Sequence, residues 1–496
     1  MENIFTGLKP ERLWYYFGEI CKIPRPSRKE EQIVSWVMEK GREFSLEVIK
    51  DATGNVIVRK QATVGMENRP VIILQSHLDM VCEKNNITFH NFESDPILPR
   101  IEGEWVKATD TTLGADDGIG VAVMLAIMEP GNLVHGPLEF LFTIDEETGL
   151  SGAEGLQPGF LNGRILLNLD SEDDGELFIG CAGGKDTSIV LPFSRETLPE
   201  GFKSFRIDVS GLKGGHSGDD INKGLGNANK ILNRLLWKAS STFGLRLSFF
   251  DGGNLRNAIA REAFALVSVP EAKAEAFEQY IIAFESLVKF ELKTTEPDLK
   301  VACISKEAAG SCITIISQEK LLNSLYACPH GVMEMSADIP GFVETSTNLA
   351  SVKTKEDHFL IGTSQRSSVE SAKDDVANMV ASVFRLVGAK VTHGLGYPGW
   401  APNPDSPILR LTRDTYTALF EVEPKVLVIH AGLECGLIGK KFPGMDMISY
   451  GPTIKGAHSP DERLLIPTVS KFWDLTVELL RNIPPQKIGR SINHSI

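Results

Sequence analysis

The sequence has few cysteines, no excess of positive charge and no long apolar run. Its seven cysteines among 496 residues are scattered from Cys21 to Cys435 without a Cys-x-x-Cys pair, which excludes a disulfide framework and fits reduced thiols in the cytosol. A net charge of −14 argues against nucleic acid or an anionic membrane as a partner. No apolar stretch approaches the ~20 residues that span a bilayer. The N-terminal stretch MENIFTGLKPERLW lacks the basic and apolar regions of a secretory signal, so we expect a cytoplasmic protein.

The composition and the order of the segments predict an α/β protein with an inserted domain. Hydrophobic residues make up 42% of the chain and charged residues 23%, as in ordinary globular proteins, and the length predicts roughly two to four domains. Strands alternate with helices near both ends, whereas the middle combines long amphipathic helices with well-patterned strands. We expect one α/β domain, with a central mixed sheet between helices, from residues 1–186 and 392–496. Residues 187–391 would form an inserted α+β domain.

Histidine and acidic side chains follow the ends of the predicted strands. The apolar run Val71–Leu74 predicts a buried strand that leads into His77 and Asp79. Residues two apart in extended chain point the same way, so these two side chains can converge on one metal ion. A lone His-x-Asp is weak evidence, because this pair arises by chance in many proteins.

Further candidates strengthen this interpretation. The strand predicted at Leu138–Ile144 ends in three successive acids, Asp145 to Glu147, which repel one another unless cations neutralise them. Asp116 and Asp117 precede an apolar helix, where they would act as helix caps or as metal ligands. The potential ligands at the strand ends are therefore His77, Asp116, Glu147, Asp170 and His458.

This set of residues suits a hydrolytic centre with two metal ions. One aspartate would bridge the ions, and each ion would take one histidine and one further carboxylate. Glu146 is the better general base, because it adjoins a ligand yet is free to point at a water molecule that bridges the metals. Asp79 is better placed to orient His77.

The inserted domain offers fewer candidates. His216 lies in the glycine-rich loop GLKGGHSGDD, where backbone can approach a ligand closely, although a loop histidine without function fits the same pattern. Arg366 follows a strand predicted at Phe359–Thr363 and would equally fit an exposed surface arginine. Cys181–Gly184 predicts a hinge. Near the N-terminus, Ser27 predicts a cap for a helix around Ile33, Trp36 and Val37.

Seven motifs occur in order along nearly the whole chain: SHLDMV, TTLGADDGIG, TIDEETG, NLDSE, GLKGGHSG, HAGLECG and GPTIKGAHSPDE. Together they resemble those of the aminoacyl-histidine dipeptidases, within the dinuclear zinc peptidases and aminoacylases. The resemblance implies a catalytic domain from both ends of the chain and an inserted lid domain that mediates dimerisation. It implies metal ligands at the five positions above, with Asp116 bridging, Glu146 as the general base and Asp79 orienting His77.

The same resemblance extends to the substrate. His216 matches a lid histidine that, in dimeric relatives, reaches the partner's active site and steadies the oxyanion. Asn257 and Arg366 match positions that hold the substrate, and an arginine fork suits its terminal carboxylate. The family commonly has Lys-Gly where this chain has Gly118-Ile119, which leaves open whether Asp116 or Asp117 bridges, and the position relative to the helix favours Asp116.

The function implied is that of a cytosolic metallodipeptidase. It would hydrolyse unblocked dipeptides, preferably Xaa-His such as β-alanyl-histidine, and form a homodimer through the lid. Two divalent ions per subunit are expected, with zinc favoured and cobalt or manganese as alternatives. The rival interpretations are an N-acyl amino acid deacylase with the same metals and a catalytically silent peptide-binding protein.

Overall fold

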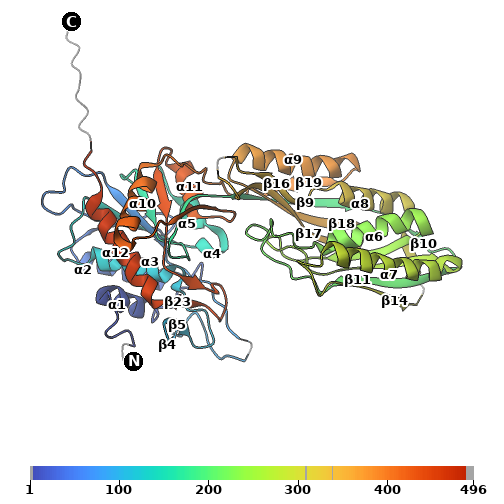
Figure 1. Cartoon of the computed structure of the whole chain (residues 1–496), viewed down its shortest axis with the longest axis horizontal. Helices are drawn as coiled ribbons and strands as arrows, with labels where there is room; N and C mark the ends of the chain where they lie inside the picture. The colour runs from blue at the N-terminus through green and yellow to red at the C-terminus, as the bar shows by residue number, and fades with distance from the viewer. Residues whose placement is uncertain (1–3, 86, 308–309, 338, 487–496) are drawn as a thin grey trace, which may run out of the picture. The chain divides into compact units, whose positions relative to one another are not determined.

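The computed structural model describes residues 4–85, 87–307, 310–337 and 339–486. The chain forms two compact units (Figure 1). Unit 1 consists of Met1–Gly180, Pro402–Val428 and Glu434–Ile496, and unit 2 of Cys181–Ala401 and Ile429–Leu433. The breaks predicted from the sequence lie after residues 186 and 391, and that prediction does not include the return of residues 429–433 to unit 2. Among the described residues, none of the helices combines the length and apolar character needed to cross a membrane.

Unit 1 is built on an eight-stranded sheet in the order β1-β2-β6-β3-β7-β21-β8-β20. The strands β6, β3, β7 and β21 run parallel, whereas β1, β2 and β8 pair antiparallel with their neighbours. The sheet is therefore mixed, which confirms the predicted fold class. The strands are β1 (Glu47–Lys50), β2 (Val56–Lys60), β3 (Ile72–His77), β6 (Leu138–Thr143), β7 (Ile165–Asn168), β8 (Glu176–Cys181), β20 (Lys425–Ile429) and β21 (Asp446–Ser449).

Helices and a small second sheet complete unit 1. Every residue of β3 and β6 is buried, because parallel strands inside a sheet are covered on both faces. The apolar helix α3 is likewise buried along most of its length. The helices are α1 (Glu11–Ile20), α2 (Glu31–Glu43), α3 (Ala115–Met128), α4 (Glu146–Gly149), α5 (Ser151–Gly155), α10 (Pro407–Phe420), α11 (Glu434–Lys441) and α12 (Ile466–Asn482). The second sheet has the order β22 (Ile454–Lys455), β23 (Arg463–Leu465), β5 (Trp105–Ala108) and β4 (Pro99–Glu102).

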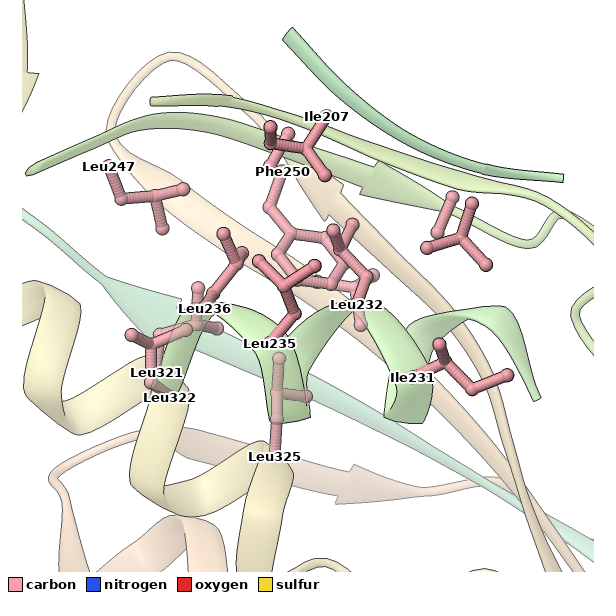
Figure 2. Close-up of a cluster of buried hydrophobic side chains, with 14 of the residues drawn as sticks. Ile207, Ile231, Leu232, Leu235, Leu236, Leu247, Phe250, Leu321, Leu322 and Leu325 are labelled. Carbon is pink, nitrogen blue, oxygen red and sulfur yellow. The ribbon is translucent and has the colours of Figure 1, made fainter. Parts of the chain in front are cut away.

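Unit 2 is an antiparallel sheet with helices, as an α+β domain requires. Leucines of α6 and α8 pack against Ile207, Leu247 and Phe250 of the sheet to form its core (Figure 2). The sheet order is β14-β11-β13-β12-β17-β18-β9-β19, with β16 paired to β17, and a two-stranded sheet joins β10 to β15. The helices are η1 (Glu271–Lys273), α6 (Ala228–Phe243), α7 (Ala274–Glu291), α8 (Ile315–Ala327) and α9 (Glu370–Leu386). The strands are β9 (Gly183–Pro192), β10 (Arg195–Thr197), β11 (Phe202–Ser210), β12 (Arg246–Gly252), β13 (Ala263–Pro270), β14 (Lys300–Lys306), β15 (Ser311–Ile313), β16 (Gly331–Met335), β17 (Val343–Thr354), β18 (His358–Ser367) and β19 (Lys390–His393).

One local prediction in unit 2 is wrong. Arg366 does not follow its strand but lies within β18, because β18 stays paired with β9 as far as Gly183, and Arg366 faces Gly184 across the ladder. The segment Cys181–Gly184 lies where unit 1 ends, at Gly180, and unit 2 begins, at Cys181. It contains the last residue of β8 and the first residues of β9, and the hinge expected there stays a prediction.

The predicted cap of the second helix is also wrong. Helix α2 begins at Glu31 after Glu30, and no side chain caps it. The hydroxyl of Ser27 instead donates to Oδ2 of Asp79 at 2.7 Å. A buried carboxylate such as that of Asp79 requires hydrogen-bond donors, and the hydroxyl of Ser27 therefore bonds to Asp79 rather than to the start of the helix.

Candidate metal centre

The candidate ligands gather at one edge of the central sheet. His77 ends β3, Glu147 follows β6 and Asp170 follows β7. These three strands are adjacent and parallel, so their carboxyl ends meet at the same edge, where ligands bind in open α/β sheets. His77 is thus the last residue of its strand, rather than lying past its end as predicted.

A first donor set joins His77, Asp116 and Asp170. Nε2 of His77 lies 3.0 Å from Oδ1 of Asp116 and 3.4 Å from Oδ1 of Asp170. The three ligand atoms all lie within 4.8 Å of one another. One imidazole nitrogen and two carboxylate oxygens are suitable donors for a zinc-like cation.

A second donor set joins Asp116, Glu147 and His458. Nε2 of His458 lies 3.1 Å from Oδ2 of Asp116 and 3.0 Å from Oε2 of Glu147, and the three ligand atoms again lie within 4.8 Å of one another. The two oxygens of Asp116 therefore face different histidines, as a bridging carboxylate would. Asp117 is buried, and its Oδ1 accepts from the N–H of Gly120 at 3.2 Å, which is the helix-capping role that the sequence left open for it.

The five side chains differ in their access to solvent. The side chain of His458 is 54% exposed, whereas those of the other four are at most 11% exposed. His458 lies in the loop between β22 and β23 with a φ of 62°. The site is thus buried on the sheet side and reached by solvent beside His458.

Asp79 belongs to neither donor set, but it contacts His77 and the backbone of Glu146 and Glu147. Its Oδ1 lies 3.4 Å from Nδ1 of His77, and its two oxygens accept from the N–H groups of Glu146 at 3.1 Å and Glu147 at 3.2 Å. Burial raises the pKa of Asp79, but His77, Ser27 and these N–H groups outweigh burial and bring it to about 2. Asp79 is therefore ionised at neutral pH, and this one carboxylate contacts both His77 and the acidic segment that follows β6.

Glu146 lies beside this support and is only half-buried. It forms a further candidate group with His77 and Glu147. Burial raises the pKa of Glu146 well above its ordinary value, and the charges of Asp170 and Glu147 raise it further. A carboxylate with a raised pKa is a better proton acceptor than an ordinary one.

The pKa shifts of the candidate ligands indicate a site with an excess of negative charge. Hydrogen bonds to Asp116 and Glu147 raise the pKa of His458 to about 11. Burial lowers the pKa of His77, but Asp170 and Asp116 outweigh burial and raise it well above its ordinary value. Burial raises the pKa of Asp170 to about 6. The donor sets therefore favour cations, and the chemistry and spacing of these residues fit two divalent metal ions.

Glu462 is a supporting residue that sequence reasoning missed. It is 2% exposed and belongs to the loop that carries His458. Its Oε2 accepts from the N–H groups of Leu113 at 2.7 Å and Gly114 at 3.0 Å, and its Oε1 accepts from that of Ala115 at 2.7 Å. This one carboxylate joins the His458 loop to the turn before Asp116. The acid in SPDE after His458 was the available signal, but its partners lie more than 300 residues earlier in the chain.

A buried polar layer beneath the ligands was also missed. Gln75, Thr143 and Asn168 precede the ligand-bearing ends of β3, β6 and β7, and all three are fully buried. Oε2 of Glu434 accepts from Nε2 of Gln75 and from Oγ1 of Thr143, each at 2.6 Å, and Nδ2 of Asn168 donates to Oε1 of Gln75 at 2.6 Å. Glu434 lies in the HAGLECG motif, so the motif has a structural role at this sheet edge.

The substrate residues predicted from the resemblance belong to unit 2. Nε2 of His216 lies 3.4 Å from Nη2 of Arg366, so the structure brings these two together. Asn257 is exposed, and its carbonyl accepts from the N–H of Ser217 at 2.8 Å. Asn257 is thereby tied to the loop of His216 through backbone.

Comparison with known proteins gives a family and close relatives. The model of peptidase family M20/M25/M40 matches residues 73–482. The cytosol non-specific dipeptidase of Escherichia coli strain K12 is 46% identical over 479 residues, which cover 97% of this chain and 99% of that protein. Aminoacylhistidine dipeptidase from Vibrio alginolyticus matches 98% of this chain and 99% of its own, with 45% identity and a TM-score of 0.90. Aminopeptidase PepT from Bacillus cereus covers 96% of this chain at a TM-score of 0.57 and 16% identity, which is a likeness of fold alone.

Proposed function

The chain belongs to peptidase family M20/M25/M40, and on this basis we propose that it is a metallodipeptidase of the cytoplasm. Its substrates are unblocked dipeptides, preferably Xaa-His such as β-alanyl-histidine. The observation that carries the proposal is the placement of Asp116, whose two oxygens face His77 and His458 in two separate donor sets. The names of the relatives from Escherichia coli and Vibrio alginolyticus support the substrate class.

The proposed cofactors are two divalent cations, with zinc favoured and cobalt or manganese as alternatives. His77 and Asp170 would hold one ion and Glu147 and His458 the other, with Asp116 shared. When bound, such ions polarise a peptide carbonyl and lower the pKa of water. The backbone hydrogen bonds from Glu146 and Glu147 to Asp79 would keep the ligand and the neighbouring base in fixed relation.

The proton transfers are assigned to Glu146. Its carboxylate takes the proton of the attacking water and delivers it to the amine that leaves when the peptide bond breaks. Burial is the main cause of the raised pKa of Glu146, and a raised pKa makes its carboxylate a stronger proton acceptor. Asp79 keeps His77 oriented and is itself ionised, because its pKa is about 2.

Substrate binding is assigned to three residues of unit 2. Arg366 binds the terminal carboxylate, His216 steadies the oxyanion, and Asn257 contacts the substrate. An arginine fork presents paired N–H donors that match a carboxylate. In this proposal the protein is a homodimer that associates through unit 2.

A substrate panel tests the proposal directly. The purified protein is incubated with β-alanyl-histidine, other Xaa-His dipeptides, dipeptides without histidine and N-acyl amino acids, and bound metal is measured on the same sample. We expect cleavage of free dipeptides, fastest for Xaa-His, about two metal equivalents per chain and loss of activity on chelation. Faster cleavage of N-acyl amino acids would instead identify a deacylase, and binding without cleavage of any substrate would indicate a silent peptide-binding protein.

A further inference from the structure

Arg366 is a buried cation without an acidic partner in the described part of unit 2. It is 7% exposed, and no carboxylate of a described residue lies within ion-pair distance of it. Nη1 of Arg366 donates to the hydroxyl of Tyr397 at 3.0 Å, and Nε has no partner among the described residues. Asp219, the acid with which Arg366 interacts at longer range, lies 3.3 Å from Nδ1 of His216 instead. Because an uncompensated buried charge is costly, this guanidinium is suited to receive an anion.

The ring of Tyr397 packs directly against the backbone of Gly184 and Gly432, in a space that any side chain at these two positions would fill. We call this space the seat of the ring. A Cβ on Gly184 would lie 2.6 Å from Cζ of the ring, and a Cβ on Gly432 would lie 2.8 Å from Cε2. Both distances are below 3.0 Å, which is closer than non-bonded contacts of real Cβ atoms come. The N–H of Tyr397 also donates to the carbonyl of Gly184 at 2.9 Å, and the N–H of Gly184 donates to the carbonyl of Tyr397 at 3.1 Å. Gly184 and Gly432 therefore fix the ring with its hydroxyl at Arg366.

The hydroxyl of Tyr397 keeps a proton to donate. A phenol has one O–H donor and accepting lone pairs, and here the oxygen accepts from Arg366, so the O–H remains available to a second acceptor. Burial raises the pKa of Tyr397 and outweighs the opposite effect of Arg366, so the phenol is protonated at neutral pH. Nearby His430 is neutral as well, because burial, assisted by Arg366, lowers its pKa to about 4. The cluster thus presents an arginine fork and one O–H, with no ionised acid paired to the fork.

We propose that Tyr397 is a specificity-determining residue that binds, together with Arg366, the C-terminal carboxylate of the dipeptide. The guanidinium supplies the charge, and the phenol both fixes the orientation of the guanidinium and donates a hydrogen bond of its own to the carboxylate. This inference rests on the proposed dipeptidase function and adds a residue that makes the enzyme favour free dipeptides over those with a blocked C-terminus.

The alternative is that Tyr397 only fills space between the two glycines. Tyr397→Phe separates the two possibilities, because it keeps the ring in its seat and removes only the hydroxyl. A hydrogen bond to a charged group contributes about 1.5–3 kcal/mol, and every 1.4 kcal/mol is a factor of ten. Loss of the hydroxyl should therefore lower kcat/KM for a free dipeptide about tenfold or more, mainly through KM.

The experiment compares a free dipeptide with its C-terminal amide, which has the same peptide bond but no carboxylate. For Tyr397→Phe we expect a loss of kcat/KM on the free dipeptide of about tenfold and a change of less than about twofold on the amide. Tyr280→Phe is the matched control, since it removes a phenol of the same unit that donates to the carbonyl of Leu235, and it should leave both substrates unaffected. Unchanged kinetics, or an equal loss on both substrates, would overturn the assignment of Tyr397.

Two further arms keep the test decisive. The wild-type enzyme is measured first, and if it cleaves no free dipeptide, the proposed function fails and the inference fails with it. If wild-type cleaves dipeptides and Tyr397→Phe does not fold, Gly432→Ala replaces it, because the added Cβ displaces the ring from its seat. The same selective loss on the free dipeptide is expected there, and an equal loss on the amide would contradict the proposal.

Discussion

The hydrogen bonds of Glu462 allow a quantitative prediction about the metal centre. In Glu462→Gln the side chain keeps its shape, but one acceptor oxygen becomes an NH₂ group that faces backbone N–H donors. If the remaining oxygen serves Leu113 and Gly114, the N–H of Ala115, at 2.7 Å from Oε1, loses its acceptor, as does the more weakly held N–H of Asp116, at 3.4 Å. Losing the shorter of these two hydrogen bonds to a charged acceptor costs about 2 kcal/mol, and the turn that carries Asp116 is expected to move in response.

The expected consequence is weaker metal binding. If the full cost falls on the positions of Asp116 and His458, a loss of 2 kcal/mol corresponds to a metal affinity about thirtyfold lower. Competition with a chromophoric chelator measures this affinity, and denaturant unfolding of the metal-free protein measures global stability. We expect the change in metal affinity to exceed the change in metal-free stability, and kcat at saturating metal to fall because Asp116 is misplaced.

The adjacent residue provides the control for this prediction. Asp461→Asn removes the same charge one position earlier, from an exposed side chain, and should leave metal affinity unchanged. Equal effects of the two variants would show that charge alone matters. Wild-type metal affinity and kcat in Glu462→Gln would refute the idea that Glu462 positions the ligand loops.

Three other predictions concern single side chains. Glu146→Ala should abolish turnover while metal content stays near that of the wild type, and full activity in this variant would rule out Glu146 as the base. His216→Ala should lower kcat without lowering metal content, whereas loss of metal would mean that His216 is a ligand. Burial raises the pKa of Glu434 to about 8, above its ordinary 4.5, so the folded state holds this proton more tightly than the unfolded state. The contribution of Glu434 to stability is therefore present below pH ~4.5 and is lost as the pH rises towards ~8. Over this pH range the free energy of unfolding of the metal-free protein should fall less in Glu434→Gln than in the wild type. Identical slopes of this free energy against pH would contradict the assignment.

The ligand positions were predictable because the signal for them is local. Short apolar runs mark buried strands, and residues such as His77 and Asp170 come directly at or after the ends of such runs. Parallel strands then bring their ends to one edge whatever the length of the intervening chain. The mixed sheet and the α+β character of the middle segment follow from the same patterns.

The supporting residues were not predictable because their partners are distant in the sequence. Glu434 contacts Gln75 across 359 positions, and Glu462 contacts Leu113 across 349. No periodicity or local motif encodes such pairs, which form only when separate loops meet. Ser27 illustrates the opposite error, since a local capping pattern was present but the buried Asp79 took the hydroxyl.

The position of β21 has a consequence for the synthesis of the chain on the ribosome. This strand pairs with β7, although about 280 residues separate Asn168 from Ser449. At ~5–20 residues per second, the edge of β7 waits roughly 15 to 55 s for its neighbour. An unpaired strand edge is a template for pairing with other chains. We therefore expect the nascent protein to be prone to aggregation while unit 2 and the segment up to β21 are translated.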